Sequence, residues 1–348
     1  MKNTYIYISV AISALLFGAA TPLSKLLLDE MHPVMLAALF YFGASLAMLP
    51  FSLPKLKAEW RVLKTDRKDA LYISGSIIFG GFLAPLALLF GIKMMYAGSA
   101  SLLLTLETVT TSFFAWFFFK EHISKRMILS SILCITASII LLFQGNFQVN
   151  FGAILVIAAT IFWGLDNNFT ASIAGISSST TTFLKSLFGG LLNLLLVWSI
   201  ASLDAQFFNV ILALLVGAFA YGVSIKLYIH SARILGAARS QIIFAINPFF
   251  GVILSFLIFS DPVGIRFLAA LLLMIISVIL LYGERHAHYH FHEETEHVHD
   301  HTHLDDHHTH EHRSISKDDK HSHPHKHSKI LHEHPHMPDI HHRHGHED

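Results

Sequence analysis

Ten long apolar segments, separated by short polar or Gly/Pro-containing stretches, make up the first 283 residues. About 20 predominantly apolar residues cross a hydrocarbon core as one helix. These segments are apolar on all sides, whereas the strands of a membrane barrel alternate apolar and polar residues. The pattern predicts an all-α integral membrane protein with ten transmembrane helices. Their expected spans are 4–28, 33–53, 70–92, 97–119, 127–143, 151–168, 181–200, 207–227, 237–259 and 265–282.

Composition separates this body from the C-terminal part of the chain. Of the 348 residues, 53% are hydrophobic and only 14% are charged, which argues against a soluble protein. Residues 1–283 hold 17 Lys/Arg and 10 Asp/Glu, whereas residues 284–348 hold 7 and 14, together with 23 of the 26 histidines. The single cysteine, Cys134, excludes an intramolecular disulfide and Cys-rich metal sites. We therefore expect a membrane body followed by a polar tail.

The basic residues of the connections indicate an orientation. Positive residues near helix ends are retained on the cytoplasmic side. The even-numbered connections hold twelve of them, whereas the odd-numbered ones hold about three, namely Lys25, Lys93 and Arg266. With ten crossings, both termini share a side with the even connections. We expect a multi-pass protein of the cytoplasmic (inner) membrane, with both termini and the tail in the cytoplasm.

An internal repeat relates the two halves of the body. At a shift of 140 residues, Leu106-Glu107-Thr108-Val109 falls on Ile246-Asn247-Pro248-Phe249. At a shift of 146, Leu16-Phe17-Gly18 falls on Phe162-Trp163-Gly164. Each half then has five crossings, and an odd number makes the second half enter from the opposite side. The sequence predicts two inverted five-helix repeats at 1–143 and 150–283, followed by a disordered tail at 284–348.

These stretches resemble the drug/metabolite transporter superfamily, specifically its EamA-type members with ten helices in two repeats. The resemblance also rests on Lys120-Glu121-His122-Ile123 and Ser260-Asp261-Pro262-Val263, which close the fourth and ninth segments, and it covers nearly the whole body. It implies a proton- or gradient-driven exporter or exchanger of small molecules. It also implies that the substrate is held between the repeats at mid-membrane.

Glu107 is the clearest candidate for function inside the membrane. An ionisable side chain at bilayer depth costs at least about 2.5 kcal/mol, so it needs a partner, a wet cavity or a role. Glu107 lies among threonines near the middle of the fourth segment, and Asn247 beside Pro248 is its repeat partner. The carboxyl group could couple protons or bind a cation. Alternatively, it could be a buried, hydrogen-bonded group that fixes helix packing.

Further polar residues follow Trp163 in the sixth segment and occur in the seventh. Asp166, Asn167 and Asn168 could line a vestibule, but we favour the interpretation that they end the helix. Lys185 could pair with Asp166 or snorkel to the headgroups. Asn193 could face a cavity or bridge helices. The candidate substrate or coupling residues are Glu107, Asn247, Asp166, Asn167, Trp163, Lys185 and Asn193.

The tail alternates histidine with other residues and has too few apolar residues for a core. Imidazoles at i and i+2 of an extended chain share a face, and neutral imidazole suits zinc, nickel, cobalt and copper(II). The tail is therefore expected to bind such ions, less tightly below about pH 6.5 because protonated imidazole cannot bind them. A purification tag, a buffering tract and compositional drift are the alternatives. The candidate ligands are His286, His288, His290, His292, His297, His299, His301, His303, His321, His323, His325, His327, His341, His342, His344 and His346.

Together these features predict a secondary active transporter, an exporter of a small metabolite or metal-related solute. The alternatives are direct efflux of Zn, Ni or Co cations and a membrane-anchored metal buffer or sensor. An enzyme is not expected, because the body shows no nucleotide loop, nucleophile–base pair or catalytic zinc spacing. No cofactor is expected to be required. The expected partners are the solute, the lipid bilayer and, as a possible homodimer, a second copy of the chain, with no nucleic acid.

Overall fold

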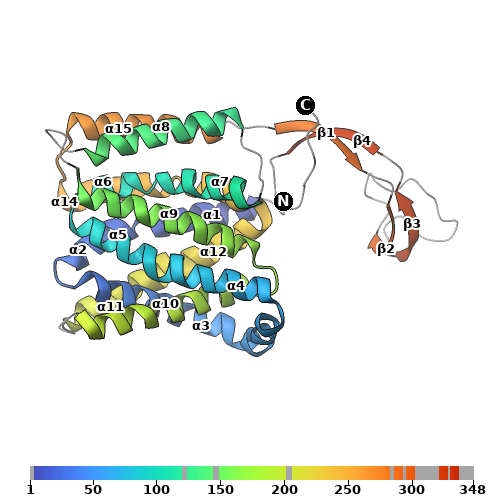
Figure 1. The fold of residues 1–348 in the computed structure, drawn as a ribbon, viewed down its shortest axis with the longest axis horizontal. Coiled ribbons are helices and arrows are strands. Elements are labelled where there is room, and N and C mark those ends of the chain that lie inside the picture. Colours follow the sequence, from blue (N-terminus) through green and yellow to red (C-terminus); the bar gives the residue numbers. More distant parts are fainter. Residues whose placement is uncertain are drawn as a thin grey trace. The chain divides into compact units, whose positions relative to one another are not determined.

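The computed structural model describes residues 4–119, 124–143, 149–200 and 206–282, together with the backbone of four strands between residues 286 and 336. The motif Lys120-Glu121-His122-Ile123 lies outside the described residues. The described part of the body is helical (Figure 1), which confirms the predicted all-α membrane class. Nine of its helical spans are long and apolar enough to cross a membrane, and a tenth, Ile265–Leu280, is shorter.

The first half begins with α1 and α2, which form one span, followed by the long helix α3. Its bounds are α1 Thr4–Gly18, α2 Ala20–Leu28, α3 Pro33–Thr65, α4 Arg67–Ser76, the π-helix η1 Ile77–Leu83, α5 Ala84–Lys93, α6 Ala97–Leu103, α7 Leu106–Phe119 and α8 Lys125–Leu142. The second half comprises α9 Phe151–Ser172, α10 Ser178–Ile200, α11 Phe207–Val216, the π-helix η3 Gly217–Val223, α12 Ser224–Leu235, α13 Ala237–Phe244, α14 Asn247–Phe259 and α15 Ile265–Tyr282.

Two helices extend well beyond their expected apolar spans. We expected the second span to end at residue 53, but α3 continues to Thr65. We expected the eighth to end at residue 227, but α12 continues to Leu235. Lys64 and Arg233 therefore lie on helices rather than in connections. Hydropathy marks only the part of a helix that meets lipid, and a helix does not end where its residues become polar.

Irregular features recur in the two halves at the spacing of the sequence repeat. The π-helices η1 and η3 begin at residues 77 and 217, which are 140 residues apart. The fourth and ninth spans are also both interrupted, at Leu104–Thr105 and at Ala245–Ile246, one residue off that spacing. A π-helical turn displaces backbone carbonyls from the regular α pattern and is often retained at functional sites. Matching segments of the halves thus carry matching backbone irregularities.

Glycines allow helices of different halves to pack closely. A Cβ atom added to Gly217 of η3 would meet the backbone carbonyl of Phe40 in α3, and one added to Gly43 would meet that of Leu214 in α11. A Cβ on Gly189 of α10 would lie 2.6 Å from the carbonyl oxygen of Gly81 in η1. Such backbone-to-backbone contact is typical of membrane helices, in which small residues rather than the hydrophobic effect permit association.

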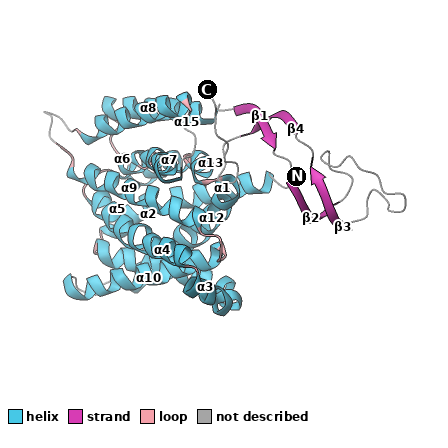
Figure 2. Ribbon diagram, turned by 45° about the vertical axis from the view of Figure 1, so that its right-hand side comes forward, coloured by secondary structure: helices cyan, strands magenta, loops and turns pink. Residues whose placement is uncertain are grey.

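Reciprocal serine pairs also join the halves. Ser13 Oγ of α1 donates to the Ser224 carbonyl at 2.7 Å, and Ser224 Oγ donates to the Ser13 carbonyl at 2.8 Å. Ser130 of α8 and Ser277 of α15 exchange the same two bonds at 3.0 and 2.9 Å. The helices α8 and α15 lie side by side along one edge of the bundle (Figure 2). In each pair the serine hydroxyl groups find hydrogen-bond acceptors within the protein, which lipid tails could not provide.

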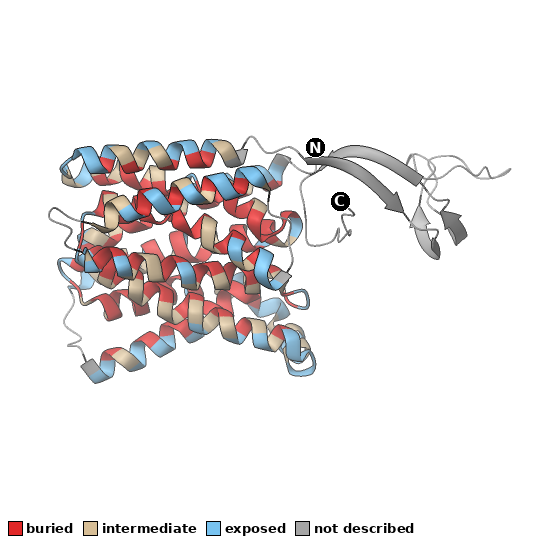
Figure 3. Cartoon of the chain, turned by 45° about the horizontal axis from the view of Figure 1, so that its top comes forward, coloured by how far each residue is buried: buried red, intermediate tan, exposed pale blue. Residues whose placement is uncertain are grey.

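Residues that face the interior of the bundle are buried, and residues on its outer faces are exposed. Figure 3 shows buried residues on the inward helix faces and exposed residues along the outer ones. Several outer residues are large and apolar, including Trp198, Phe207 and Leu257, which are 86%, 80% and 75% exposed. A soluble protein would not leave so many such side chains in water, so lipid covers these faces.

The tail is described only as backbone, in four short strands. Strand β1 (His286–His292) pairs antiparallel with β4 (Ile330–His336), and β2 (Thr295–His301) pairs antiparallel with β3 (His321–His327). The expected disorder of the tail stays a prediction. A two-stranded ribbon alone is only marginally stable in water. The candidate ligands His303, His341, His342, His344 and His346 lie outside the described residues.

The close packing of η3 on α3 gives a stability prediction. We expect Gly217→Ala to lower the free energy of unfolding by about 1–3 kcal/mol, because the added methyl group meets backbone that cannot rotate away. Gly264→Ala is the matched control, because a Cβ there has nothing within 4 Å. Thermal unfolding in one detergent measures both. Equal stability of the two variants would contradict the packing argument.

Candidate functional site

Glu107 lies in the first turn of α7, directly after the interruption at Leu104–Thr105. Its side chain is 4% exposed. The Nδ2 atom of Asn167 in α9 donates a hydrogen bond to Glu107 Oε1 at 2.8 Å. The other carboxyl oxygen, Oε2, is buried and has no hydrogen-bond partner among the described residues. One oxygen is thus held by the protein while the other is unengaged.

Asn167 holds together three helices around Glu107. Besides the carboxyl group, its Nδ2 atom lies 3.1 Å from Thr111 Oγ1 in α7 and 3.3 Å from Gln241 Oε1 in α13. Glu107, Thr111, Asn167 and Gln241 are all buried, and we call these four residues the polar cluster. It consists of one carboxyl group surrounded by amides and a hydroxyl.

Asp166, the neighbour of Asn167 in the chain, belongs to a second cluster. Lys185 Nζ of α10 forms an ion pair with Asp166 Oδ2, and both residues are buried. Ser76 Oγ at the end of α4 donates to Asp166 Oδ1. A Cβ atom added to Gly80 of η1 would collide with the Asp166 carboxyl group. The absence of a side chain at Gly80 therefore leaves the space in which this carboxylate meets Lys185. Lys185 thus pairs with Asp166 and does not extend to the headgroups.

The polar residues of the sixth span do not end its helix, so our interpretation of them as a helix terminus is wrong. The helix α9 continues through Asp166, Asn167 and Asn168 to Ser172. Asn168 Nδ2 donates to the Thr111 carbonyl at 3.0 Å and to the Gly164 carbonyl at 2.8 Å. Neighbouring helices engage Asp166, Asn167 and Asn168, and the additional bond from Asn168 to the Gly164 carbonyl stays within α9, so none of these side chains ends the helix.

An aromatic cluster adjoins the polar cluster along α9 and α13. Trp163 precedes Asn167 by four residues, and Phe244 follows Gln241 by three, so each aromatic side chain shares a helix face with a polar one. The ring of Phe17 lies 5.5 Å from Trp163, 5.5 Å from Tyr221 and 5.4 Å from Phe244, centroid to centroid. All four rings are buried. They form an apolar wall next to the amides.

The remaining two candidates, Asn193 and Asn247, donate hydrogen bonds to backbone carbonyls. Asn193 Nδ2 donates to the carbonyl of Gly81 in η1 at 3.2 Å and to that of Gly189 at 2.8 Å, so it bridges α10 to the π-helix. Asn247 Nδ2 donates to the Phe244 carbonyl at 3.0 Å. Among the described residues, no hydrogen bond joins Asn247 to its repeat partner Glu107. The repeat alignment therefore identifies related positions rather than contacting side chains.

Sequence reasoning did not single out Gln241, Ser76 or Tyr41. Tyr41 Oη donates to the Gly80 carbonyl, which belongs to the π-helix η1. Gln241 was detectable, because it is a strongly polar residue inside an apolar run six residues before Asn247. Ser76 and Tyr41 gave no such signal, since serine and tyrosine are common in membrane helices. Only the packing of α3 and α4 against η1 and α9 reveals them.

At one end of the bundle, Glu59, Asp69 and Arg233 bind the connection at 173–177. We call these three residues the basic-end clamp. Asp69 Oδ2 accepts from the Gly175 backbone N–H at 2.6 Å, and Glu59 Oε1 accepts from that of Ser177 at 3.1 Å. Arg233 donates to the Thr170 carbonyl and to Thr181 Oγ1. The clamp joins α3, α4 and α12 to the connection between α9 and α10.

The opposite end has a simpler closure. Lys25 Nζ of α2 donates to the backbone carbonyls of Ile92, Lys93 and Met95, at 3.0, 3.3 and 3.1 Å. These carbonyls lie at and just beyond the end of α5, where the regular helical hydrogen bonds stop. A cation near the C-terminal end of a helix is also favoured by the helix dipole. Both ends of the bundle are thus closed by long basic side chains that bind backbone carbonyls.

The described side chains contain no group of three or more His, Cys, Asp or Glu residues placed to hold a metal ion. The tail histidines of the four strands are described by backbone alone. Metal binding by the tail therefore stays a prediction.

Comparisons with known proteins identify related chains. The model of the EamA-like transporter family matches residues 4–143 and 150–283. An uncharacterized transporter of Methanothermobacter thermautotrophicus is 27% identical, over 81% of this chain and 87% of its own. The uncharacterized inner membrane transporter YicL of Salmonella typhimurium is 24% identical, over 79% and 94%. A solved structure described as "Crystal structure of protein" has a TM-score of 0.60 and 13% identity, covering 80% of this chain and 95% of that one, and shows similarity of fold.

The buried ion pair gives a second prediction. We expect Lys185→Met to reduce the free energy of unfolding by about 3–5 kcal/mol, because it leaves the Asp166 charge buried without its partner. Asp166→Asn combined with Lys185→Met should be less destabilising than the sum of the two single changes. Denaturation of the four proteins in one detergent measures this cycle. Lys57→Met, on the exposed part of α3, is the control, and strictly additive single effects would refute the coupling.

Proposed function

Because the chain belongs to the EamA-like transporter family and is a multi-pass membrane transporter, we propose that it is a secondary active exporter of a small metabolite or metal-related solute. The polar cluster and the adjoining aromatic cluster are its solute and coupling site, in the cytoplasmic membrane. The single observation that carries this proposal is the unengaged Oε2 atom of the buried Glu107.

Charge balance distinguishes Glu107 from the other acid at this site. The Asp166 carboxylate is neutralised by Lys185, whereas Glu107 forms no ion pair with a described residue. An isolated carboxylate away from water costs several kcal/mol. In the closed bundle, Glu107 must therefore carry a proton or meet a positively charged group of the solute. When a positively charged group of the solute replaces the proton on Glu107, solute movement is coupled to proton movement. A proton gradient directed inward then drives export of the solute.

The side chains around Glu107 support an organic solute. Asn167, Gln241 and Thr111 offer amide and hydroxyl groups, and Phe17 and Trp163 offer aromatic faces. Such a mixture of few polar groups and an apolar wall is typical of small-molecule sites. One carboxylate among amides is a poor ligand set for zinc, nickel or cobalt, which prefer imidazole or thiolate. A small metabolite or a metal chelate fits the site better than a bare cation.

Alternating access supplies the remaining part of the mechanism. The recurrence of π-helices and helix interruptions at the repeat spacing supports two inverted halves that exchange roles. The basic-end clamp would open toward the cytoplasm, and the Lys25 closure would open toward the other side. Each closure consists of hydrogen bonds that water replaces when its end opens. The tail, on the cytoplasmic side, would bind transition metal there.

Transport by Glu107→Gln tests the site. We expect the rate of gradient-driven flux in sealed proteoliposomes to fall at least about tenfold, or about 1.4 kcal/mol, because the amide cannot exchange a proton. The probes are a panel of amino acids and small organic amines and, separately, Zn²⁺, Ni²⁺ and Co²⁺ salts. Glu30→Gln is the matched control, because Glu30 is exposed outside the helices.

The outcomes separate the proposal from its alternatives. Flux of an organic probe that Glu107→Gln abolishes supports the metabolite exporter. Flux of the metal salts alone would favour direct cation efflux, which the histidine-rich tail makes the second candidate. Unchanged flux in Glu107→Gln would leave Glu107 a packing residue. The absence of flux of any probe, with zinc still bound by the full chain, would favour a membrane-anchored buffer.

Truncation tests the tail separately. We expect a chain ended after Gly283 to lose most zinc binding measured by titration calorimetry, because nearly all histidines follow that residue. In the full chain, zinc affinity should be higher at pH 7.5 than at pH 5.5, since protons compete for imidazole below about pH 6.5. Equal zinc affinity of the truncated and full chains would contradict a metal-binding tail.

A further inference from the structure

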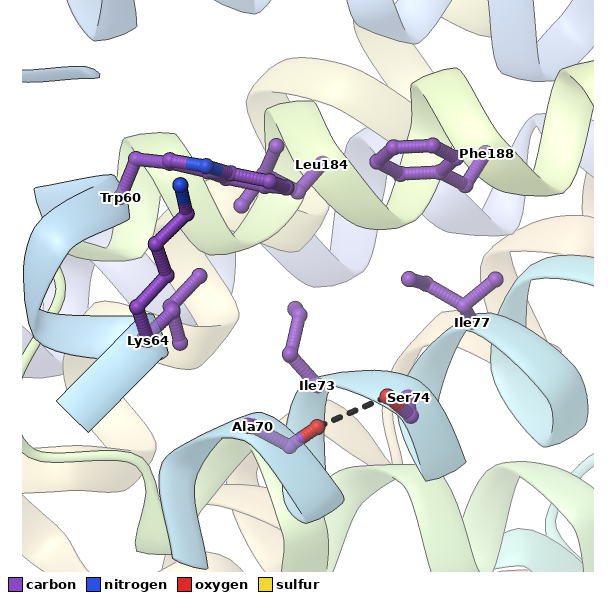
Figure 4. Close-up of a pocket in the computed structure, with 9 residues that line it drawn as sticks. Trp60, Lys64, Ala70, Ile73, Ser74, Ile77, Leu184 and Phe188 are labelled. Atoms are coloured by element: carbon purple, nitrogen blue, oxygen red, sulfur yellow. Dashed lines mark hydrogen bonds between the residues drawn. The ribbon is translucent and has the colours of Figure 1, made fainter. Parts of the chain in front are cut away.

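A pocket of about 290 Å³ is lined by residues of α3, α4, η1 and α10, and none of the four residues of the polar cluster lines it (Figure 4). The C-terminal part of α3 contributes Trp60 and Lys64, α4 and η1 contribute Ile73 and Ile77, and α10 contributes Leu184 and Phe188. Ile73 and Leu184 are buried, whereas Trp60 and Lys64 are exposed. The pocket thus has an apolar floor and a charged, aromatic rim, which is the polarity gradient of a lipid molecule.

The length of α3 places this rim at the membrane surface. Its 33 residues exceed the roughly 20 that cross a hydrocarbon core, and Pro50 and Pro54 lie inside it where its apolar part ends. The apolar part of α3 precedes Lys55, so the turns that carry Trp60 and Lys64 project beyond the hydrocarbon. Tryptophan is enriched at this depth because its ring is amphipathic.

The charges around the rim are unbalanced. The end of α3 and the start of α4 carry six basic residues and three acids, and all three acids are engaged within the protein. Glu59 and Asp69 accept hydrogen bonds from the connection at 173–177, and Asp66 caps α4 by accepting from the Lys68 backbone N–H at 2.9 Å. No described residue forms a hydrogen bond or ion pair with the Lys64 ammonium group. The rim therefore presents a free positive charge above an apolar floor.

We propose that this pocket binds one anionic phospholipid. Its phosphate group pairs with Lys64 beside Trp60, and an acyl chain covers Ile73, Ile77 and Phe188. The occupant also lies against the helices that build the ion pair, because Ile77 follows Ser76 and Leu184 precedes Lys185 in the chain. The inference rests on the pocket alone and does not depend on the proposed transport cycle.

Quenching of Trp60 fluorescence by brominated lipids tests the site in the full chain. The protein is placed in lipid nanodiscs of phosphatidylcholine with increasing fractions of brominated phosphatidylglycerol or brominated phosphatidylcholine. The Trp60 contribution is the difference between the wild type and Trp60→Phe. We expect half-maximal quenching at an about fivefold lower fraction of phosphatidylglycerol, the preference that one lysine near a membrane surface confers.

Three variants make the test specific. Lys64→Glu should remove the preference for phosphatidylglycerol. Lys55→Glu makes the same charge change nine residues earlier, on the opposite face of α3, and should retain the preference. Ser74→Phe places a ring in the pocket from an exposed position, leaves the tryptophans unchanged and should abolish saturable quenching of Trp60. Equal quenching by both lipids in the wild type would overturn the proposal, as would a preference that survives Lys64→Glu.

Discussion

The interior of the bundle depends on the pairing of buried polar groups along one helix, α9. Asp166 and Asn167 are consecutive residues, so their side chains leave α9 about 100° apart. One meets Lys185 and Ser76 on the side of α10 and α4, and the other meets Glu107 and Gln241 on the side of α7 and α13. A movement of α9 therefore changes both clusters together, which links the neutral ion pair to the unengaged carboxyl group.

Glycine and the π-helices make those pairings geometrically attainable. Gly80 leaves room for the Asp166 carboxyl group, and the displaced carbonyls of η1 accept hydrogen bonds from Tyr41 and Asn193. A regular α-helix with larger residues at this position would keep α9 and α10 too far from the third span for these bonds. The backbone irregularity thus has a direct role in the site, and its recurrence in η3 brings α3 equally close to the eighth span.

Hydropathy predicted the helical spans because lipid contact is a property of each segment by itself. It did not predict where α3 and α12 end, since a helix continues past the lipid when its polar residues find water or partners. Glu107, Asp166, Asn167 and Lys185 were recognisable because charge and amides are costly in an apolar run. Their partners were not, because the contact between Asn167 and Gln241 depends on packing between distant segments. The expected helix terminus at Asp166 failed for the same reason: Asp166 and Asn167 find partners on other helices, so α9 continues past them.

The two closures of the bundle differ in kind, and the difference bears on how either could open. At one end Lys25 binds only backbone carbonyls, so opening exposes one cation and the end of α5 to water, which solvates both. At the other end the clamp combines two carboxylates, a guanidinium group and the backbone of one connection. Because Glu59, Asp69 and Arg233 come from three different helices, this end opens only if those helices separate from the 173–177 connection together. The two ends thus differ in where their charges lie: three charged side chains from three helices bind one connection at one end, and a single lysine binds backbone carbonyls at the other.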